Sequence, residues 1–454
     1  MIPPKPAARP DRVPLWRHLR LFRQDILSAQ PERLYRAWMA EFRSPFFRSF
    51  LCNDPTLVVE VLETCPEDFP KSGRLAEGLR PLLGDSVFLT NGEDWRRQRR
   101  IIDPAFAGGR LRELFGAMLA AGESAAARLA AQPGVVEIEP FASHLAADII
   151  FRTLFSRTIE DRTARAVYDH FRIFQREQPL LNAAAFFRLP RWMPRLHPRG
   201  AVSAAREIRR LISDLVHERA ERIAEGTAPD DLATRIMTTP DPVTGRCFSP
   251  AEMIDQVAIF FLAGHETSAT ALAWAIYLCA CDPDLQDRIR DEAELLAQGA
   301  DLSAISRLRV SRDVFRETLR LYPPVPMMVR ESRCPAKFRG RSVPTGSQIV
   351  ISPWHMQRHE RLWERPDVFD PGRWSTEAGR AAAHRAYLPF SKGPRICPGA
   401  GFAMVEGPLM LSVLIRALRF APVEGKTPVP VAYLTVRSRD GIFLRVHSRN
   451  ATKS

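Results

Sequence analysis

Residues 390–399 read Phe390-Ser391-Lys392-Gly393-Pro394-Arg395-Ile396-Cys397-Pro398-Gly399. One cysteine follows bends rich in glycine and proline, with an arginine close by and an apolar run of helical spacing after it. A thiolate at the N-terminus of a helix and beside a cation is stabilised by the helix dipole and by backbone N–H groups that lack partners. A single cysteine taken alone is more often a buried structural residue. Here the surroundings favour Cys397 as a ligand for a soft or borderline metal.

This stretch follows the pattern Phe-x-x-Gly-x-Arg-x-Cys-x-Gly. The pattern resembles the haem-ligand signature of the cytochrome P450 family. The resemblance implies that Cys397 is the axial thiolate ligand of the iron in haem b, and that Phe390 and Arg395 contact the same cofactor. It also implies the fold of that family, which is mainly α with small β-sheets in a single large domain.

A long apolar helix is predicted from Pro250 to Cys281, and its middle is polar, reading Phe260-Phe261-Leu262-Ala263-Gly264-His265-Glu266-Thr267-Ser268. A glycine inside a helix costs about 1 kcal/mol relative to alanine. Polar groups buried without partners add to that cost. Two interpretations are open: the polar groups face a wet cavity, or the hydroxyls bond back to the preceding helical turn.

The same segment is similar to the family's Ala-Gly-x-Glu-Thr motif, which crosses the oxygen-binding face of the haem. The resemblance implies that Thr267 holds the bound dioxygen and a water, and that Glu266 passes protons inward. It also implies that Gly264 leaves space for oxygen. A carboxyl and a hydroxyl at adjacent helix positions can start such a proton relay.

Glu317 and Arg320 fit the family's Glu-x-x-Arg helix, and Arg373 follows in a meander that is rich in proline, arginine and tryptophan. The Glu-x-x-Arg pattern is weak by itself, because an ion pair at this spacing is usually a solvated helix face. The order of the motifs along the chain selects this pair. The resemblance implies that the three residues form a buried structural network that supports the haem-ligand loop.

Trp95 and Arg99 fit a Trp-x-x-x-Arg helix that reaches the haem carboxylates in the family. Carboxylates at a buried ring edge require cations or indole N–H donors. The resemblance nominates Trp95, Arg99, Arg330 and Arg395 for this contact.

Three positions depart from the common pattern of the family. Ser391 stands where glycine is frequent, and Gln357 stands where many relatives have histidine, so no cofactor contact is carried over to Gln357. Pro398 follows the cysteine and has no N–H to donate to its sulfur. We hypothesise that the thiolate is therefore more electron-rich and that the ferric state is favoured.

Apolar residues from the regions that face the ligand in the family are candidates for a substrate pocket. The candidates are Phe88, Phe260, Phe261, Val325, Met327 and Met328, with Leu79, Leu82, Leu83, Val87, Leu89 and Val257 beside them. Residues 180–192, which include Phe186 and Phe187, could form a mobile lid. Core packing is the alternative for each residue. Together they imply an apolar substrate such as a fatty acid, a terpene or a steroid, and none of them is an arginine that would anchor a carboxylate.

The chain has 454 residues, of which 45% are hydrophobic and 26% charged, so a large core is available. It contains no glycine- or serine-rich linker and no evident repeat. We therefore expect a Pro- and Arg-rich segment over residues 1–40 and one haem-thiolate monooxygenase domain over residues 41–454. Helices are expected over 55–62, 104–129, 141–154, 207–225 and 310–321, and strands over 348–351 and 442–446.

The net charge of +13 comes almost wholly from arginine. A basic surface suits an acidic protein partner or an anionic membrane, and no aromatic and basic module for nucleic acid is found. The seven cysteines are scattered, without a Cys-x-x-Cys pair, which favours a reducing compartment. The N-terminus has no apolar run long enough to cross a bilayer. We expect a soluble, cytoplasmic monomer, in which residues 15–26 form a docked surface helix or lie on a membrane.

The resemblance implies an oxidoreductase, a haem-dependent monooxygenase. Such an enzyme inserts one oxygen atom from dioxygen into a hydrophobic small molecule by hydroxylation or epoxidation. No flavin or iron–sulfur domain is found, so electrons are expected from a separate ferredoxin or flavodoxin with its reductase. The alternatives are a peroxygenase driven by hydrogen peroxide and a non-catalytic haem-binding sensor. Glu266 and Thr267 count against both, since neither needs a proton relay.

Overall fold

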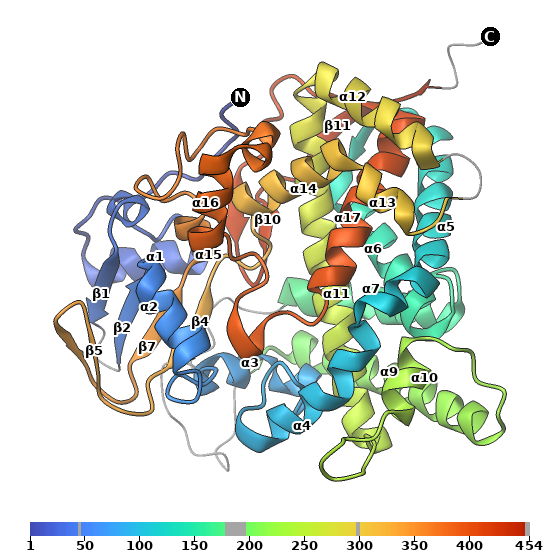
Figure 1. Ribbon diagram of the computed structural model, residues 1–454, viewed down its shortest axis with the longest axis horizontal. Helices are drawn as coiled ribbons and strands as arrows, with labels where there is room; N and C mark the ends of the chain where they lie inside the picture. The colour runs from blue at the N-terminus through green and yellow to red at the C-terminus, as the bar shows by residue number, and fades with distance from the viewer. Residues whose placement is uncertain (44–46, 178–196, 297–299, 450–454) are drawn as a thin grey trace.

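The structure is a computed structural model that describes residues 1–43, 47–177, 197–296 and 300–449 (Figure 1). Its α-helices are α1 (Leu15–Gln24), α2 (Pro55–Val59), α3 (Gly73–Leu83), α4 (Gly92–Ile102), α5 (Leu111–Ala130), α6 (Ile138–Phe155), α7 (Arg162–Glu177), α9 (Arg199–Ala224), α10 (Leu232–Thr238), α11 (Pro250–Ala280), α12 (Pro283–Ala293), α13 (Ser303–Arg307), α14 (Arg309–Leu321), α15 (Pro353–Met356), α16 (Glu377–Ala386) and α17 (Ala400–Ala417). Short 3-10 or π turns are η1 (Glu32–Tyr35), η2 (Glu60–Thr64), η3 (Asp103–Phe106), η4 (Gly108–Arg110), η5 (Glu294–Leu296), η6 (Pro371–Ser375) and η7 (Gly393–Arg395).

The strands are β1 (Met39–Arg43), β2 (Arg48–Cys52), β3 (Gly134–Glu137), β4 (Met328–Glu331), β5 (Ala336–Phe338), β6 (Arg341–Val343), β7 (Gln348–Ile351), β8 (Leu418–Pro422), β9 (Pro430–Ala432), β10 (Val436–Ser438) and β11 (Phe443–Ser448). They form one four-stranded sheet in the order β1-β2-β7-β4, a three-stranded sheet in the order β3-β11-β8, and the two-stranded pairs β9–β10 and β5–β6. In the largest sheet β2 and β7 are parallel, and the other pairs are antiparallel. Helices dominate, which confirms the expected fold class.

Helix α11 passes through the middle of the molecule and packs against α6, α9, α14 and α17 (Figure 1). It begins with a capping box between Ser249 and Glu252, and Pro250 occupies its first turn. The helix is apolar nearly all round, so it is covered on most sides. The largest sheet lies at the left of Figure 1, beside this helical body. The site described below lies on the segments that join the two regions.

Helix boundaries differ most from the expected ones at two places. The helix expected from residue 104 begins at Leu111, because η3 and η4 form around Pro104 and a pair of glycines. Helix α9 begins at Arg199, eight residues before the expected start at Glu207, because a buried alanine stripe continues its apolar face toward Pro198. The strand expected over 348–351 is β7 itself.

The first residues of the chain dock on the helical body. The Phe369 N–H donates to the Met1 carbonyl at 2.9 Å, and the Tyr322 hydroxyl donates to the Pro4 carbonyl at 2.7 Å. The Lys5 ammonium pairs with Asp367 at 2.9 Å. This segment therefore lies against the meander that follows α15. Within the described ranges, α17 is long and apolar enough to cross a bilayer, and 67% of that stretch is buried inside the protein.

Candidate functional site

The loop that carries Cys397 is held by three contacts. The Cys397 N–H donates to the Phe390 carbonyl at 2.9 Å, which closes the loop. Gly393 has a φ of 70°, and a Cβ there would lie 2.1 Å from the Leu62 carbonyl oxygen of η2. Only glycine meets both demands. The Arg395 guanidinium donates to the Pro66 carbonyl at 2.6 Å, so the loop is fixed against η2.

The sulfur of Cys397 lies in a recess. The residue is accessible to solvent, yet enough protein surrounds it that burial raises the pKa of its thiol. The Gly399 N–H and the charge of Arg99 act in the opposite direction and are outweighed. The cation that acts on the sulfur is thus Arg99, whereas the sequence pointed to Arg395. Burial thus favours the protonated form of the free thiol, and a metal that displaces the proton would secure the predicted thiolate.

Ser391 departs from glycine at a strained position in this loop. Its φ is 66°, in the left-handed region, and its buried hydroxyl has no hydrogen-bond partner within the described chain. We expect Ser391→Gly to raise the free energy of unfolding by about 1 kcal/mol, because both penalties disappear. Urea denaturation of the two proteins measures the difference. A lower midpoint for the glycine variant would show that the hydroxyl is bonded and that the strain is small.

Three cations lie around the Trp95 indole, and a fourth, Arg330, lies beside one of them. The guanidinium of Arg395 lies 5.1 Å from the ring centroid, that of Arg99 6.0 Å, and the Lys71 ammonium 5.8 Å. Lys71 and Arg330 are partners in an isolated antiparallel bridge, so their side chains start side by side. Burial and the charges of the three arginines lower the pKa of Lys71 to about 6. Buried beside these positive charges, Lys71 loses its proton far more readily than an ordinary lysine.

This cluster fits the carboxylates of a haem. The Nε atoms of Arg330 and Arg395 are buried and donate to no atom within the described ranges. A bound dianion would satisfy them and relieve the repulsion that lowers the pKa of Lys71. No group of three or more potential metal ligands exists among the residues that the structure describes. A metal brought by a cofactor, with Cys397 as its protein ligand, suits this arrangement.

One stripe of α11 is open although its neighbours are buried. Ala263 is exposed, and Phe260, Gly264 and Thr267 are half-buried, at the spacing of a single helix face. The helix therefore borders a hollow at its polar middle. Gly264 has a packing role besides the predicted one, because a Cβ there would lie 2.4 Å from the Cδ1 atom of Ile150. The glycine lets α6 approach closely.

The polar groups of α11 have three different kinds of partner. The Thr267 hydroxyl donates to the Ala263 carbonyl at 2.5 Å, which is the bond back to the preceding turn. Ser268 donates to the Glu406 carboxylate of α17 at 2.6 Å. Burial raises the pKa of Glu406 to about 7. Glu266 is buried and accepts from Thr435 at 2.6 Å and from Arg437.

The structure divides the pocket candidates. Phe88 and Val325 are exposed, and Met327 and Met328 are half-buried, as is Phe260. Phe261 is a correction, because it is buried against Phe151 and Phe171, at 4.9 and 4.6 Å between ring centroids. Buried neighbours that also belong to the core are Leu79, Leu82, Leu83, Val87, Leu89 and Val257. The proposed lid, residues 180–192, lies outside the described residues.

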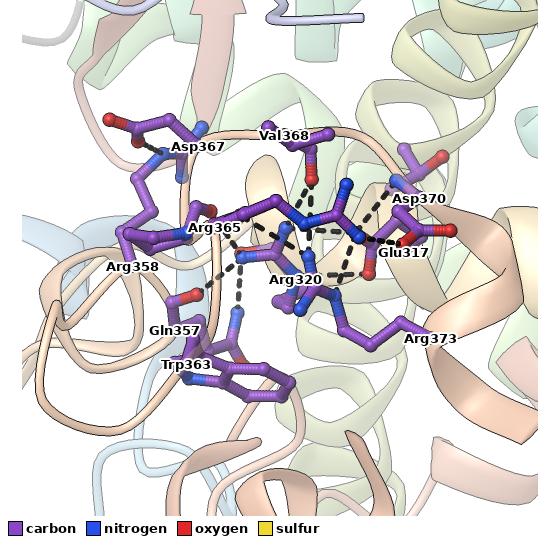
Figure 2. Close-up of polar contacts among 12 residues, drawn as sticks. Glu317, Arg320, Gln357, Arg358, Trp363, Arg365, Asp367, Val368, Asp370 and Arg373 are labelled. Carbon is purple, nitrogen blue, oxygen red and sulfur yellow. Dashed lines mark hydrogen bonds and ion pairs between the residues drawn. The ribbon is translucent and has the colours of Figure 1, made fainter. Parts of the chain in front are cut away.

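Glu317, Arg320 and Arg373 meet in a buried network (Figure 2). The Arg320 guanidinium makes two bonds to the Glu317 carboxylate, at 2.8 and 2.9 Å, and Arg373 approaches the same carboxylate at 3.3 Å. The two arginines also donate to backbone carbonyls of the meander, at Gln357, Glu364, Arg365, Pro366 and Val368. One carboxylate and two cations thus hold an irregular segment that has few bonds of its own.

Gln357 connects this network to the cysteine loop. Its amide donates to the carbonyls of Leu319 and Arg320 at 2.8 and 3.0 Å, and it accepts the Leu388 N–H at 2.7 Å. Leu388 precedes Phe390 by two residues, so the end of α14 is tied to the start of the loop. The position that often carries histidine therefore has a positioning role here, away from the cation cluster.

Several residues of the site carry no signal in the sequence. Lys71, Glu406, Thr435 and Arg437 fall outside every local motif. Tyr433 and Leu434, in the β9–β10 turn, are exposed apolar residues next to Thr435. Only the scarcity of lysine in an arginine-dominated chain would single out Lys71.

Comparisons with known proteins agree with this geometry. The family model described as "Cytochrome P450" matches residues 10–443. Cyclooctat-9-en-7-ol 5-monooxygenase of Streptomyces melanosporofaciens is 30% identical over 427 residues, which cover 92% of this chain and 90% of the relative. A cytokinin hydroxylase of Arabidopsis thaliana is 29% identical over 430 residues, covering 90% and 82%. The solved structure of the cytochrome P450DA heme domain has a TM-score of 0.82 at 24% identity, with 98% of each chain covered, and supports the fold.

Proposed function

Because the chain belongs to the cytochrome P450 family and is a haem-thiolate monooxygenase, we propose that it hydroxylates or epoxidises an apolar small molecule, with Cys397 as the iron ligand. The family requires dioxygen, a hydrophobic substrate and a redox partner. When bound, haem supplies the binding and reductive activation of dioxygen. The remaining work falls to residues of this chain.

The observation that carries the proposal is the pairing of an accessible cysteine with a cluster of cations in which the buried Nε donors of Arg330 and Arg395 have no acceptor within the described residues. Trp95, Arg99, Arg330 and Arg395 would bind the haem carboxylates, as two arginines around an indole, with a third close by, suit a dianion. Phe390, whose carbonyl closes the cysteine loop, would pack against the cofactor. The carbon monoxide difference spectrum of the reduced protein tests the thiolate ligand.

Protons would reach the oxygen through Glu266 and Thr267. Thr267 lies on the open stripe of α11, and Glu266 is the adjacent carboxylate. We expect Thr267→Ala to lower the product formed per reductant consumed by about tenfold, because a positioned donor is lost. Product and hydrogen peroxide are measured in the same reaction with reductase partners. Equal product yields for the variant and the parent would exclude Thr267 from this role.

The same reaction separates the competing functions. A peroxygenase would form product with hydrogen peroxide alone and would not need the partners, and a sensor would form none under either condition. The acid and the hydroxyl on α11 favour the oxygen-dependent monooxygenase.

The substrate is proposed to be fatty acid-, terpene- or steroid-like. The exposed pocket candidates, Phe88 and Val325, are apolar. The printed names of two relatives refer to cyclooctat-9-en-7-ol and to cytokinin. A screen of lipophilic compounds for the shift of the haem from low to high spin identifies the class. A set of small charged ligands that shifts the spectrum, with no lipophilic one, would overturn this proposal.

The electron donor is proposed to be a ferredoxin or flavodoxin with its reductase. A net charge of +13 suits an acidic partner. We further propose a monomer in the cytoplasm, a compartment consistent with seven unpaired cysteines.

Pro398 offers a test of how the sulfur is tuned. The Gly399 N–H donates to the sulfur, whereas Pro398 has no N–H to offer. We expect Pro398→Ile to raise the reduction potential by on the order of 50 mV, because an added donor stabilises the reduced state through the less basic sulfur. A spectroelectrochemical titration measures the potential. Pro394→Ile, in the same loop, is the control, and an unchanged or lower potential for Pro398→Ile alone would contradict the expectation.

A further inference from the structure

The β9–β10 hairpin holds the buried carboxylate of α11 from outside the helix. Thr435 donates to one oxygen of Glu266 at 2.6 Å, and the Arg437 guanidinium pairs with the same oxygen. The side chain of Glu266 is 7% exposed and that of Arg437 is 34% exposed. Arg437 therefore runs from the buried acid to the protein surface.

A second carboxylate bonds to the residue that follows this arginine. Glu139, in the first turn of α6, accepts the Ser438 N–H at 2.8 Å, and Ser438 follows Arg437 in β10. Glu139 is half-buried, and the charge of Arg437 acts on it. Burial raises its pKa to about 7, so the group can hold a proton near neutral pH. Glu137, two residues earlier, is exposed.

Within the described residues, the other charged or titratable groups that act here are Glu137, His265 and Arg172; Glu137 is exposed and its charge adds to the raised pKa of Glu139. His265 is buried beside Glu266 in α11, and burial lowers its pKa to about 3, so it stays neutral. Arg172 of α7 acts on His265 and cannot release a proton. Glu139 is thus the group next to Arg437 that can both bind and release a proton near neutral pH.

We propose that Glu139 is the proton donor for Glu266, and that Arg437 is the cation between them, able to pair with either carboxylate. This inference rests on the proposed role of Glu266. A proton passes from the Glu139 carboxyl through water to the Glu266 carboxylate, and Glu139 is then reprotonated from solvent, so charge and protons balance. Arg437 stabilises whichever carboxylate is ionised and keeps its own proton throughout. Glu139 and Arg437 are positioning residues, since neither touches the reacting oxygen.

A purely structural ion pair would also explain the contacts but predicts different behaviour. A partly exposed pair contributes little to stability, about 0–1 kcal/mol. Such a pair would leave the rate, its solvent isotope effect and its pH profile unchanged when Glu139 becomes glutamine. Glutamine keeps the oxygen that accepts the Ser438 N–H, so the fold of α6 and β10 is preserved.

The experiment compares Glu139→Gln with Glu137→Gln, its exposed neighbour, in the full-length haem-loaded protein. Reductant consumption is measured with saturating ferredoxin and reductase, with styrene as the apolar probe and without it, in light and heavy water. Glu139→Gln is expected to slow the reaction about tenfold, raise its solvent isotope effect and remove the ionisation near pH 7 from the profile. Glu137→Gln is expected to keep the rate and the isotope effect of the parent and to move the ionisation slightly to lower pH, because the charge of Glu137 is a minor cause of the raised pKa of Glu139. The carbon monoxide spectrum and melting temperature confirm that each variant is folded.

The reference variant Glu266→Gln separates failure of the role of Glu139 from failure of the role of Glu266. If it slows the reaction and Glu139→Gln does not, the inference fails while the role of Glu266 stands. If neither variant changes the rate although both give the thiolate spectrum, the role of Glu266 fails and this inference with it. Arg437→Gln is the second variant, and a rate equal to that of the parent would exclude the proposed role of Arg437.

Discussion

Replacing Arg320 with methionine is expected to lower the free energy of unfolding by about 3–5 kcal/mol, because a buried carboxylate loses its bidentate partner. Glu317 and Arg320 are both fully buried. After the change, Glu317 keeps the longer contact to Arg373 at 3.3 Å and the Asp370 N–H at 3.1 Å. The carbonyls of Gln357 and Pro366 lose their Arg320 donor as well. Guanidinium denaturation measures the change in stability, and transfer of haem to an apo-globin measures cofactor loss.

A control for this variant lies in the same meander. Arg365 pairs with Asp370 at 3.1 Å, but its side chain is 61% exposed. Arg365→Met should change the stability by no more than about 1 kcal/mol, since exposed pairs contribute little. Equal losses from the two substitutions would show that burial of the Glu317 network is not what makes it costly to break.

Cys397→Ser is expected to abolish the thiolate spectrum of the carbon monoxide complex and to reduce monooxygenase activity at least about 100-fold. Substitutions of residues that only hydrogen-bond to a metal ligand already cost up to about 100-fold. A serine hydroxyl is a far weaker acid than a thiol and its oxygen is a harder ligand, so it does not replace the sulfur as an electron donor to iron. The loop itself should persist, because its closing bond uses the backbone of Cys397 and Phe390. Spectra and product formation with reductase partners provide the measurements.

Cys247 provides the matched control, as it is also solvent-accessible and belongs to a segment before α11. Cys247→Ser should retain both the spectrum and the activity. Full activity of Cys397→Ser would require a different iron ligand and would remove the basis of the proposed function.

The sequence supports prediction of the site wherever its chemistry is local. Cys397, the pair Glu266–Thr267 and the Glu317–Arg320 spacing are short motifs on one loop or one helix, and the fold that they imply is confirmed by the helical architecture. The two phenylalanines of α11 show where prediction from the sequence fails. Because this helix is apolar nearly all round, its pattern gives no period that separates the open Phe260 from the packed Phe261.

Groups brought together by the fold could not be predicted. Lys71 reaches Trp95 only because β4 pairs across to its segment at Arg330. Glu139 and Arg437 come from a helix and a strand that are far apart in the sequence. The acidity of Cys397 also depends on tertiary enclosure, since burial outweighs the local helix terminus that the sequence displays.

The ring of cations around Trp95 has a consequence for biosynthesis. Its members lie between Lys71 and Arg395, so the nascent chain cannot assemble a binding place for the prosthetic group until residue 395 has been synthesised. Until then, like charges oppose one another's approach. When the cofactor is scarce in an expression host, the newly made chain should therefore remain incompletely folded and be degraded by proteases. It should not accumulate as a stable haem-free protein.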